Sequence, residues 1–201
     1  MYYQQFSATI VTKEGEVKAF HPHSYNSKSK LMLQSYISNP YVSIVLNQLK
    51  RGDRLYWLGE YANYEELHNK DLKISEDEWD NVYEVWYNLN KFVYIEDENY
   101  ERQRYVINLT KKCYIDLDDS RAFGINTECK EINYFHPIPL LCSVGNGNTY
   151  GDYYGVNSEL CGAWAGDEII VSNDEKDIKG LYNYTHDVWF RYDETQNCEV
   201  F

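Results

Sequence analysis

Residues 54–62 read RLYWLGEYA, and this stretch decides the fold that the sequence predicts. Aromatic and apolar residues fill a run of strand length, and Gly52 stands just before it. Short runs of this composition, bounded by turn residues, are typical of β-strands. We therefore expect a strand here and look for its partners on either side.

Upstream of this strand, the pattern predicts a hairpin and then helices. Residues 2–12 and 17–20 are two apolar runs on either side of a Glu-Gly turn, which is typical of a β-hairpin. Residues 31–37 predict a short helix. Residues 39–52 predict another helix, because an Asn-Pro pair opens the segment, apolar residues recur at helical spacing, and an Arg-Gly pair closes it.

Downstream, a capping box formed by Ser75 and Glu78 opens a predicted amphipathic helix that ends near Leu89. Residues 134–144 are apolar but contain two prolines, so they predict an edge strand or a polyproline-like segment. Further strands are expected at residues 92–95, 104–109, 112–117, 168–172 and 182–192.

Together these elements predict an α+β fold, in which a mostly antiparallel sheet has two or three helices packed on one side. The chain has 201 residues, no linker rich in Pro, Gly or Ser, and no internal repeat. One domain spanning residues 1–201 is therefore the expected organisation.

The charge of the chain is unevenly distributed. Its formal net charge is −13. Residues 1–54 hold 7 Lys/Arg and 3 Asp/Glu, whereas residues 55–201 hold 12 Lys/Arg and 29 Asp/Glu. Such an acidic body repels phosphates and anionic lipid, which argues against direct nucleic-acid binding by the acidic part and against membrane association.

The predicted helix near residue 80 concentrates part of this charge. Its carboxylates are candidates for contact with a basic surface of a partner protein: Glu76, Asp77, Asp80 and Glu84. The alternative is that the acidic residues serve solubility alone. The sequence leaves both interpretations open.

The cysteines and the N-terminus predict a cytoplasmic location. The five cysteines include no C-x-x-C pair and are odd in number, which favours reduced thiols over a disulfide framework. The first residues, MYYQQFSATIV, lack the basic and apolar regions of a signal peptide. No stretch of 18 apolar residues predicts a transmembrane helix.

Residues 145–155 read GNGNTYGDYYG and form the strongest candidate for a ligand site. Glycine permits unusual backbone angles and close approach of a ligand, and sites often lie in loops that follow buried segments. If this segment converges with residues 57–61, the two would form an acidic, aromatic-lined pocket. The candidate residues are Asn146, Asn148, Asp152, Trp164, Asp167, Trp57 and Glu60. The alternatives are a long turn between strands and separate surface carboxylates.

No motif predicts a cofactor, a metal or a known reaction. The glycine spacing is not that of a dinucleotide fingerprint or a P-loop. His21 and His23 have metal-like spacing but no third ligand nearby in the sequence, so we interpret them as a surface turn. His136 precedes a proline and is interpreted as structural. No hydrolase, zinc-protease or cysteine-based signature occurs, so we do not expect an enzyme, although the sequence leaves this uncertain.

Several segments resemble an uncharacterised group of bacterial and phage proteins. The resemblance lies in LYWLGEYA at residues 55–62, in the hairpin at 106–115, and in patches between residues 136 and 165. These proteins carry a W-x-G-D-Y-A strand and a loop richer in glycine and arginine. Asn148 and Tyr150 differ from that loop, so an anion-binding role is not carried over. The resemblance implies a phage or mobile-element setting and no particular activity.

The predicted function is that of an acidic interaction protein. We expect it to bind and modulate or inhibit a host protein with a basic surface, for example a nucleic-acid-handling defence protein. The alternative is an enzyme or small-ligand-binding protein whose site lies in residues 145–167. The sequence names neither the partner, the ligand nor the oligomeric state.

Overall fold

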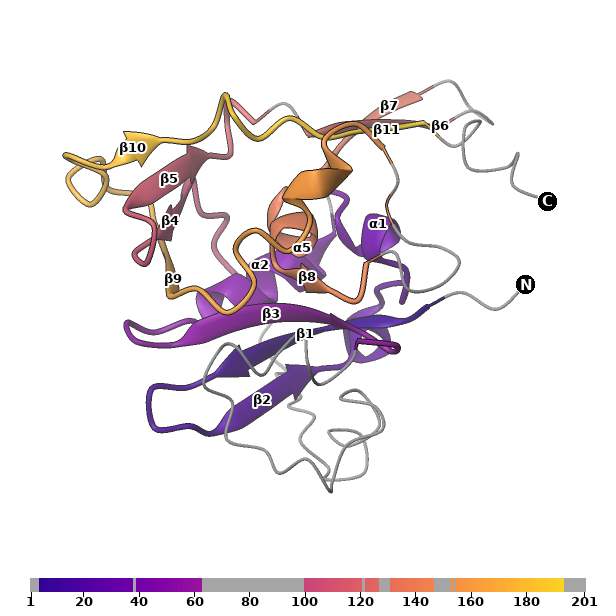
Figure 1. Cartoon of the computed structure of the whole chain (residues 1–201), viewed down its shortest axis with the longest axis horizontal. Helices are drawn as coiled ribbons and strands as arrows, with labels where there is room; N and C mark the ends of the chain where they lie inside the picture. Colours follow the sequence, from indigo (N-terminus) through magenta and orange to yellow (C-terminus); the bar gives the residue numbers. More distant parts are fainter. Residues whose placement is uncertain are drawn as a thin grey trace.

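The computed structural model describes residues 4–37, 39–62, 100–120, 122–126, 131–146, 153 and 155–193. The predicted helix at residues 75–89 and the predicted strand at 92–95 lie outside the described residues. The described elements confirm the α+β class, with helices and antiparallel-dominated mixed sheets (Figure 1).

The stretch quoted first forms β3 (Arg54–Gly59), in the interior of a four-stranded sheet of order β2-β1-β3-β8. The other strands of this sheet are β1 (Phe6–Val11), β2 (Val17–Phe20) and β8 (Ser143–Val144). β1 pairs antiparallel with both β2 and β3, so the predicted hairpin is confirmed. β8 pairs parallel with β3, with Trp57 opposite Ser143.

Three helices lie on one side of this sheet, as Figure 1 shows: α1 (Leu31–Gln34), α2 (Pro40–Asn47) and α5 (Ile138–Leu141). Asn39 caps α2, because its side chain accepts a hydrogen bond from the Tyr41 amide at 3.0 Å. The Tyr41 hydroxyl then accepts from the Ala8 amide at 2.9 Å and donates to the Phe20 carbonyl. One side chain thus fixes α2 to both strands of the hairpin.

The remaining strands form two smaller sheets. One has the order β10-β5-β4-β9, and its antiparallel hairpin of β4 and β5 lies where residues 104–117 predict it. Its strands are β4 (Tyr105–Asn108), β5 (Cys113–Asp116), β9 (Ile169–Ser172) and β10 (Tyr182–Asn183). The other has the order β11-β6-β7, from β6 (Phe123–Asn126), β7 (Glu131–Tyr134) and β11 (Arg191–Asp193).

Residues 138–141 form a helical turn, so the prediction of an edge or polyproline-like segment at 134–144 is wrong for this part. The reason is the position of the prolines. Pro137 occupies the N-cap of α5 and Pro139 lies in its first turn. The first amides of a helix have no partner within the helix, so a residue without an N–H fits there.

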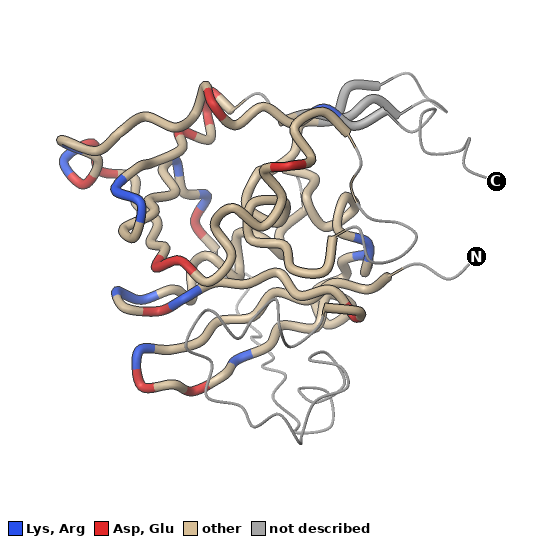
Figure 2. Tube along the Cα trace, in the orientation of Figure 1, with Lys and Arg blue, Asp and Glu red and all other residues tan. Residues whose placement is uncertain are grey.

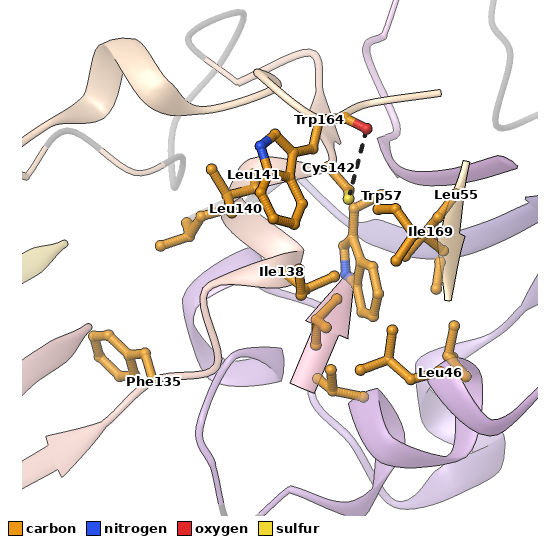
Figure 3. Packing of buried hydrophobic residues seen from close by; sticks show 14 of the residues in the cluster. Leu46, Leu55, Trp57, Phe135, Ile138, Leu140, Leu141, Cys142, Trp164 and Ile169 are labelled. Carbon is orange, nitrogen blue, oxygen red and sulfur yellow. Dashed lines mark hydrogen bonds between the residues drawn. The ribbon is translucent and has the colours of Figure 1, made fainter. Parts of the chain in front are cut away.

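The main core lies between the four-stranded sheet and the helices, and Figure 3 shows part of its packing. Leu55 and Trp57 of β3 face this core, whereas Tyr56 and Leu58 face a second, smaller cluster. Both faces of β3 are therefore buried, as expected for a strand with a nearly continuous apolar run. No helix of the described residues is long and apolar enough to cross a membrane.

Candidate functional site

A cleft of about 430 Å³ lies in the segment that the sequence singles out as a site. One wall comes from β8 and the residues just after it, and the other from the segment around η3 (Ser158–Leu160). In Figure 1 this second segment passes over α5 and β8 before it descends to β9. The lining residues are Ser143, Val144, Gly145, Asn146, Ser158, Glu159, Cys161, Gly162 and Ala165.

Gly162 holds the two walls together. Its amide donates to the Leu140 carbonyl at 3.0 Å, and its φ is +80°. A Cβ at this position would lie 2.7 Å from the Ser143 carbonyl oxygen. Real Cβ atoms do not approach an oxygen so closely, so only glycine allows this crossing of the chain.

The side chain of Asn146 forms two hydrogen bonds with the backbone of Tyr153 at one end of the cleft. Its Oδ1 accepts from the Tyr153 amide at 2.8 Å, and its Nδ2 donates to the Tyr153 carbonyl at 3.1 Å. Both ends of the side-chain amide therefore bond to the protein's own backbone. The contact explains why an asparagine stands here, and it gives Asn146 a structural part in the cleft wall.

Tyr153 connects the end of the cleft to the interior of the protein through its hydroxyl group. Its hydroxyl donates toward the carbonyls of Val156 at 2.6 Å and Arg191 at 2.9 Å, and accepts from the Arg191 amide at 3.0 Å. Burial raises the pKa of Tyr153 well above its usual value, the backbone hydrogen bond with Arg191 opposes this, and the nearby ionisable groups of Cys161 and Glu159 add to the increase. The hydroxyl therefore stays protonated and serves as a structural cross-link.

Among the described residues that line the cleft, Glu159 is the one with a charged side chain. It is exposed, and within the described part of the chain no cation pairs with it. Cys161 is half-buried and forms no disulfide. The cleft thus offers a carboxylate, a thiol, hydroxyls and backbone groups, which suit a polar or positively charged ligand.

Trp57 and Trp164 are fully buried and lie in the core, as Figure 3 shows. The Trp57 indole donates to the Gln34 side-chain oxygen, which belongs to α1. The Trp164 ring stacks on Tyr184 with 5.7 Å between ring centroids. Neither indole lines the cleft, so their contribution is to pack the elements beneath it.

Asp167 and Glu60 lie near opposite ends of β3, and each accepts a hydrogen bond from a neighbouring segment. Asp167 accepts from the Asn108 side chain at 2.8 Å and lies 3.4 Å from the Lys111 ammonium. Glu60 accepts from the Gln5 amide at 3.4 Å. Neither carboxylate lines the cleft, and the structure does not bring them together with Glu159.

The other predicted site residues cannot be placed. Asn148 and Asp152 of the candidate ligand site lie outside the described residues. The acidic residues proposed for partner contact, Glu76, Asp77, Asp80 and Glu84, lie outside them as well.

His136 is buried, whereas His21 and His23 lie next to each other near the start of η1 (Pro22–Tyr25). The His136 Nδ1 accepts from the Ile138 amide at 3.3 Å. Burial, with a contribution from the positive charge of Arg102, lowers the pKa of His136 to about 3, so the ring is neutral at pH 7. The rings of His21 and His23 lie 5.2 Å apart. In the described residues no group of three or more His, Cys, Asp or Glu could hold a metal ion.

Carboxylates gather on the loops at the ends of β5 and β9, as Figure 2 shows. The exposed members are Asp118, Asp119, Asp174, Glu175 and Asp177. Four of them have a basic side chain nearby: Arg102 lies 2.9 Å from Asp118, His186 3.4 Å from Asp119, Lys176 3.8 Å from Asp174 and Arg104 3.4 Å from Glu175. Side chains more than half exposed form weak ion pairs in water, so these carboxylates stay available to another molecule.

The sequence did not single out Ser158, Glu159 or Cys161, which lie in the cleft. One signal for them was Asn157, which has a left-handed backbone with φ of +60° and begins the turn of η3. Asparagine tolerates this conformation better than most residues.

Comparison of the chain with protein-family models, with curated proteins and with solved structures finds no match.

Proposed function

We propose that this chain is an acidic interaction protein, which binds a basic surface of a host protein in the cytoplasm and modulates or inhibits it. The observation that carries the proposal is the charge distribution: residues 55–201 hold 29 Asp/Glu against 12 Lys/Arg. A field of this sign attracts a basic partner over a distance of about 10 Å at ordinary salt and repels nucleic acid. It accelerates association and favours partners of opposite charge.

The described surface supports the proposal at the loops near β5 and β9. Their carboxylates are largely exposed, from 56% for the Asp118 and Asp174 side chains to 75% for Glu175. Exposed carboxylates lose little hydration free energy when a cation approaches, because they remain partly hydrated at the rim of an interface. The second acidic region is the set Glu76, Asp77, Asp80 and Glu84. A nucleic-acid-handling defence protein is one class of host protein with a suitable basic channel.

The cleft favours a second candidate function, the binding of a small ligand. Its volume of about 430 Å³ falls in the range of sites that hold small molecules, about 300–1,000 Å³. In this alternative the protein retains a metabolite, or acts on one, at the walls formed by β8 and η3.

Affinity capture from a lysate of the native host, followed by mass spectrometry, distinguishes the two candidates. The wild-type chain is compared with a triple variant, Glu76→Lys, Asp77→Lys and Asp80→Lys. We expect a stoichiometric partner with a basic surface, retained by the wild type and lost by the variant. Strong binding by the variant would count against docking at that set of residues.

The matched control is a second triple variant, Asp174→Lys, Glu175→Lys and Asp177→Lys, which changes the net charge equally at the loop after β9. Equal loss in both variants would indicate a general field effect, whereas loss in one alone locates the contact. If no protein is captured and native mass spectrometry of the purified chain detects a bound metabolite, the second candidate replaces the first.

A further inference from the structure

We infer that the cleft between β8 and η3 receives a lysine or arginine side chain from a basic segment of a partner protein, with Glu159 as its counter-charge. This inference rests on the proposed function and adds a specific contact to it. It commits to one occupant, a positively charged peptide segment, because the charge of the cleft and that of the whole chain have the same sign.

The lining residues define the chemistry of the occupant. Of the lining residues that the structure describes, Glu159 alone is charged, and no Lys, Arg or His in the described part of the chain forms an ion pair with it. The hydroxyl of Ser158 and the backbone of Gly145 add polar groups beside it. An ammonium or guanidinium group is a donor only, so it can pair with the Glu159 carboxylate and with a hydroxyl oxygen such as that of Ser158.

The described walls of the cleft are fixed by contacts within the protein itself. Gly162 fixes the crossing of its walls, and the amide of Asn146 is engaged on the backbone of Tyr153. The hydroxyl of Tyr153 in turn joins the carbonyls of Val156 and Arg191. A preformed cleft loses little conformational entropy on binding, so a single ion pair in it contributes more than one between mobile surface chains.

The negative charge of Glu159 is also felt inside the protein. It contributes to the raised pKa of Tyr153, after burial, which is the largest cause. The carboxylate of Glu159 is itself exposed to solvent, so an entering cation can reach it.

The test uses a fluorescent peptide of alternating glycine and arginine, titrated by anisotropy into the whole chain. Three proteins are compared: the wild type, Glu159→Gln and Glu14→Gln. Glu14 is exposed in the turn between β1 and β2, outside both the cleft and the acidic loops, and Glu14→Gln has the same net charge as Glu159→Gln. We expect Glu159→Gln to weaken binding about three- to tenfold and Glu14→Gln by less than about twofold.

Amide chemical shifts locate the peptide independently of affinity. The inference requires shifts at residues 143–146 and 158–162 on addition of the peptide. It is overturned if the peptide does not bind, if Glu159→Gln and Glu14→Gln weaken binding equally, or if the shifts lie elsewhere. A free arginine derivative that binds as tightly as the peptide would also overturn it, in favour of a small-molecule site. The capture experiment does not use Glu159, so it decides the proposed function separately.

Discussion

Replacing Gly162 by alanine tests whether the crossing of the two cleft walls depends on the absence of a Cβ. The positive φ of +80° costs alanine about 1–2 kcal/mol, because a left-handed backbone brings Cβ close to the following carbonyl. The new Cβ would also meet the Ser143 oxygen at 2.7 Å, and overpacking of this kind costs about 1–3 kcal/mol. Together they predict a loss of about 2–5 kcal/mol in the free energy of unfolding for Gly162→Ala.

Gly180→Ala is the matched control. Gly180 has nearly the same φ of +81°, but a Cβ there would meet nothing within 4 Å. This variant should therefore lose only the backbone part, about 1–2 kcal/mol. Urea denaturation monitored by tryptophan fluorescence gives both values by linear extrapolation. If Gly162→Ala is no less stable than Gly180→Ala, the close approach to Ser143 does not hold the cleft together.

Three further predictions concern single side chains. Asn39→Ala should lower the free energy of unfolding by about 1 kcal/mol, because the Tyr41 amide loses its cap; urea denaturation measures it, and an unchanged midpoint would contradict the cap. Asp167→Ala should cost about 1–3 kcal/mol, because it leaves the buried amide of Asn108 without its acceptor, whereas a fully stable variant would leave Asp167 free for another role. The pKa of His136 is about 3 in the folded chain and near 6.5 in the unfolded chain. The neutral buried ring therefore adds its full share to the free energy of unfolding above pH 6.5, and this share is lost as the pH falls from 6.5 toward 3. Wild type should therefore lose about 2 kcal/mol more than His136→Gln between pH 7 and pH 5, and parallel losses in the two proteins would refute the burial of a neutral ring.

Local signals in the sequence were sufficient for much of the fold. The hairpin of β1 and β2, the cap at Asn39 and the hairpin of β4 and β5 depend on neighbouring residues, and all three form where the sequence predicts them. Residues 138–141 show the limit of the same reasoning. A proline argues against a strand interior, but it is equally suited to the first turn of a helix, and only the packing of α5 decides between them.

The sequence indicated a segment that borders the cleft, but it did not indicate most of the residues that line the cleft. The glycine-rich segment does border the cleft through Gly145 and Asn146. Trp57, however, lies on the face of β3 that packs into the core. An aromatic residue in a strand does not by itself indicate which face it occupies. Glu159 and Gly145 line the same cleft, and Gly162 allows the chain between them to cross close to the Ser143 carbonyl. Contacts of this kind join residues distant in sequence and leave no periodic pattern.

The central claim is that the acidic charge of this chain binds a basic protein partner. The most direct measurement is the dissociation constant of the captured partner for the wild type, compared at low salt and at about 0.3 M salt. The account predicts tight binding at low salt that weakens at least tenfold at high salt, since screening removes the attraction between the acidic surface and the partner. A dissociation constant that does not change with salt would contradict it.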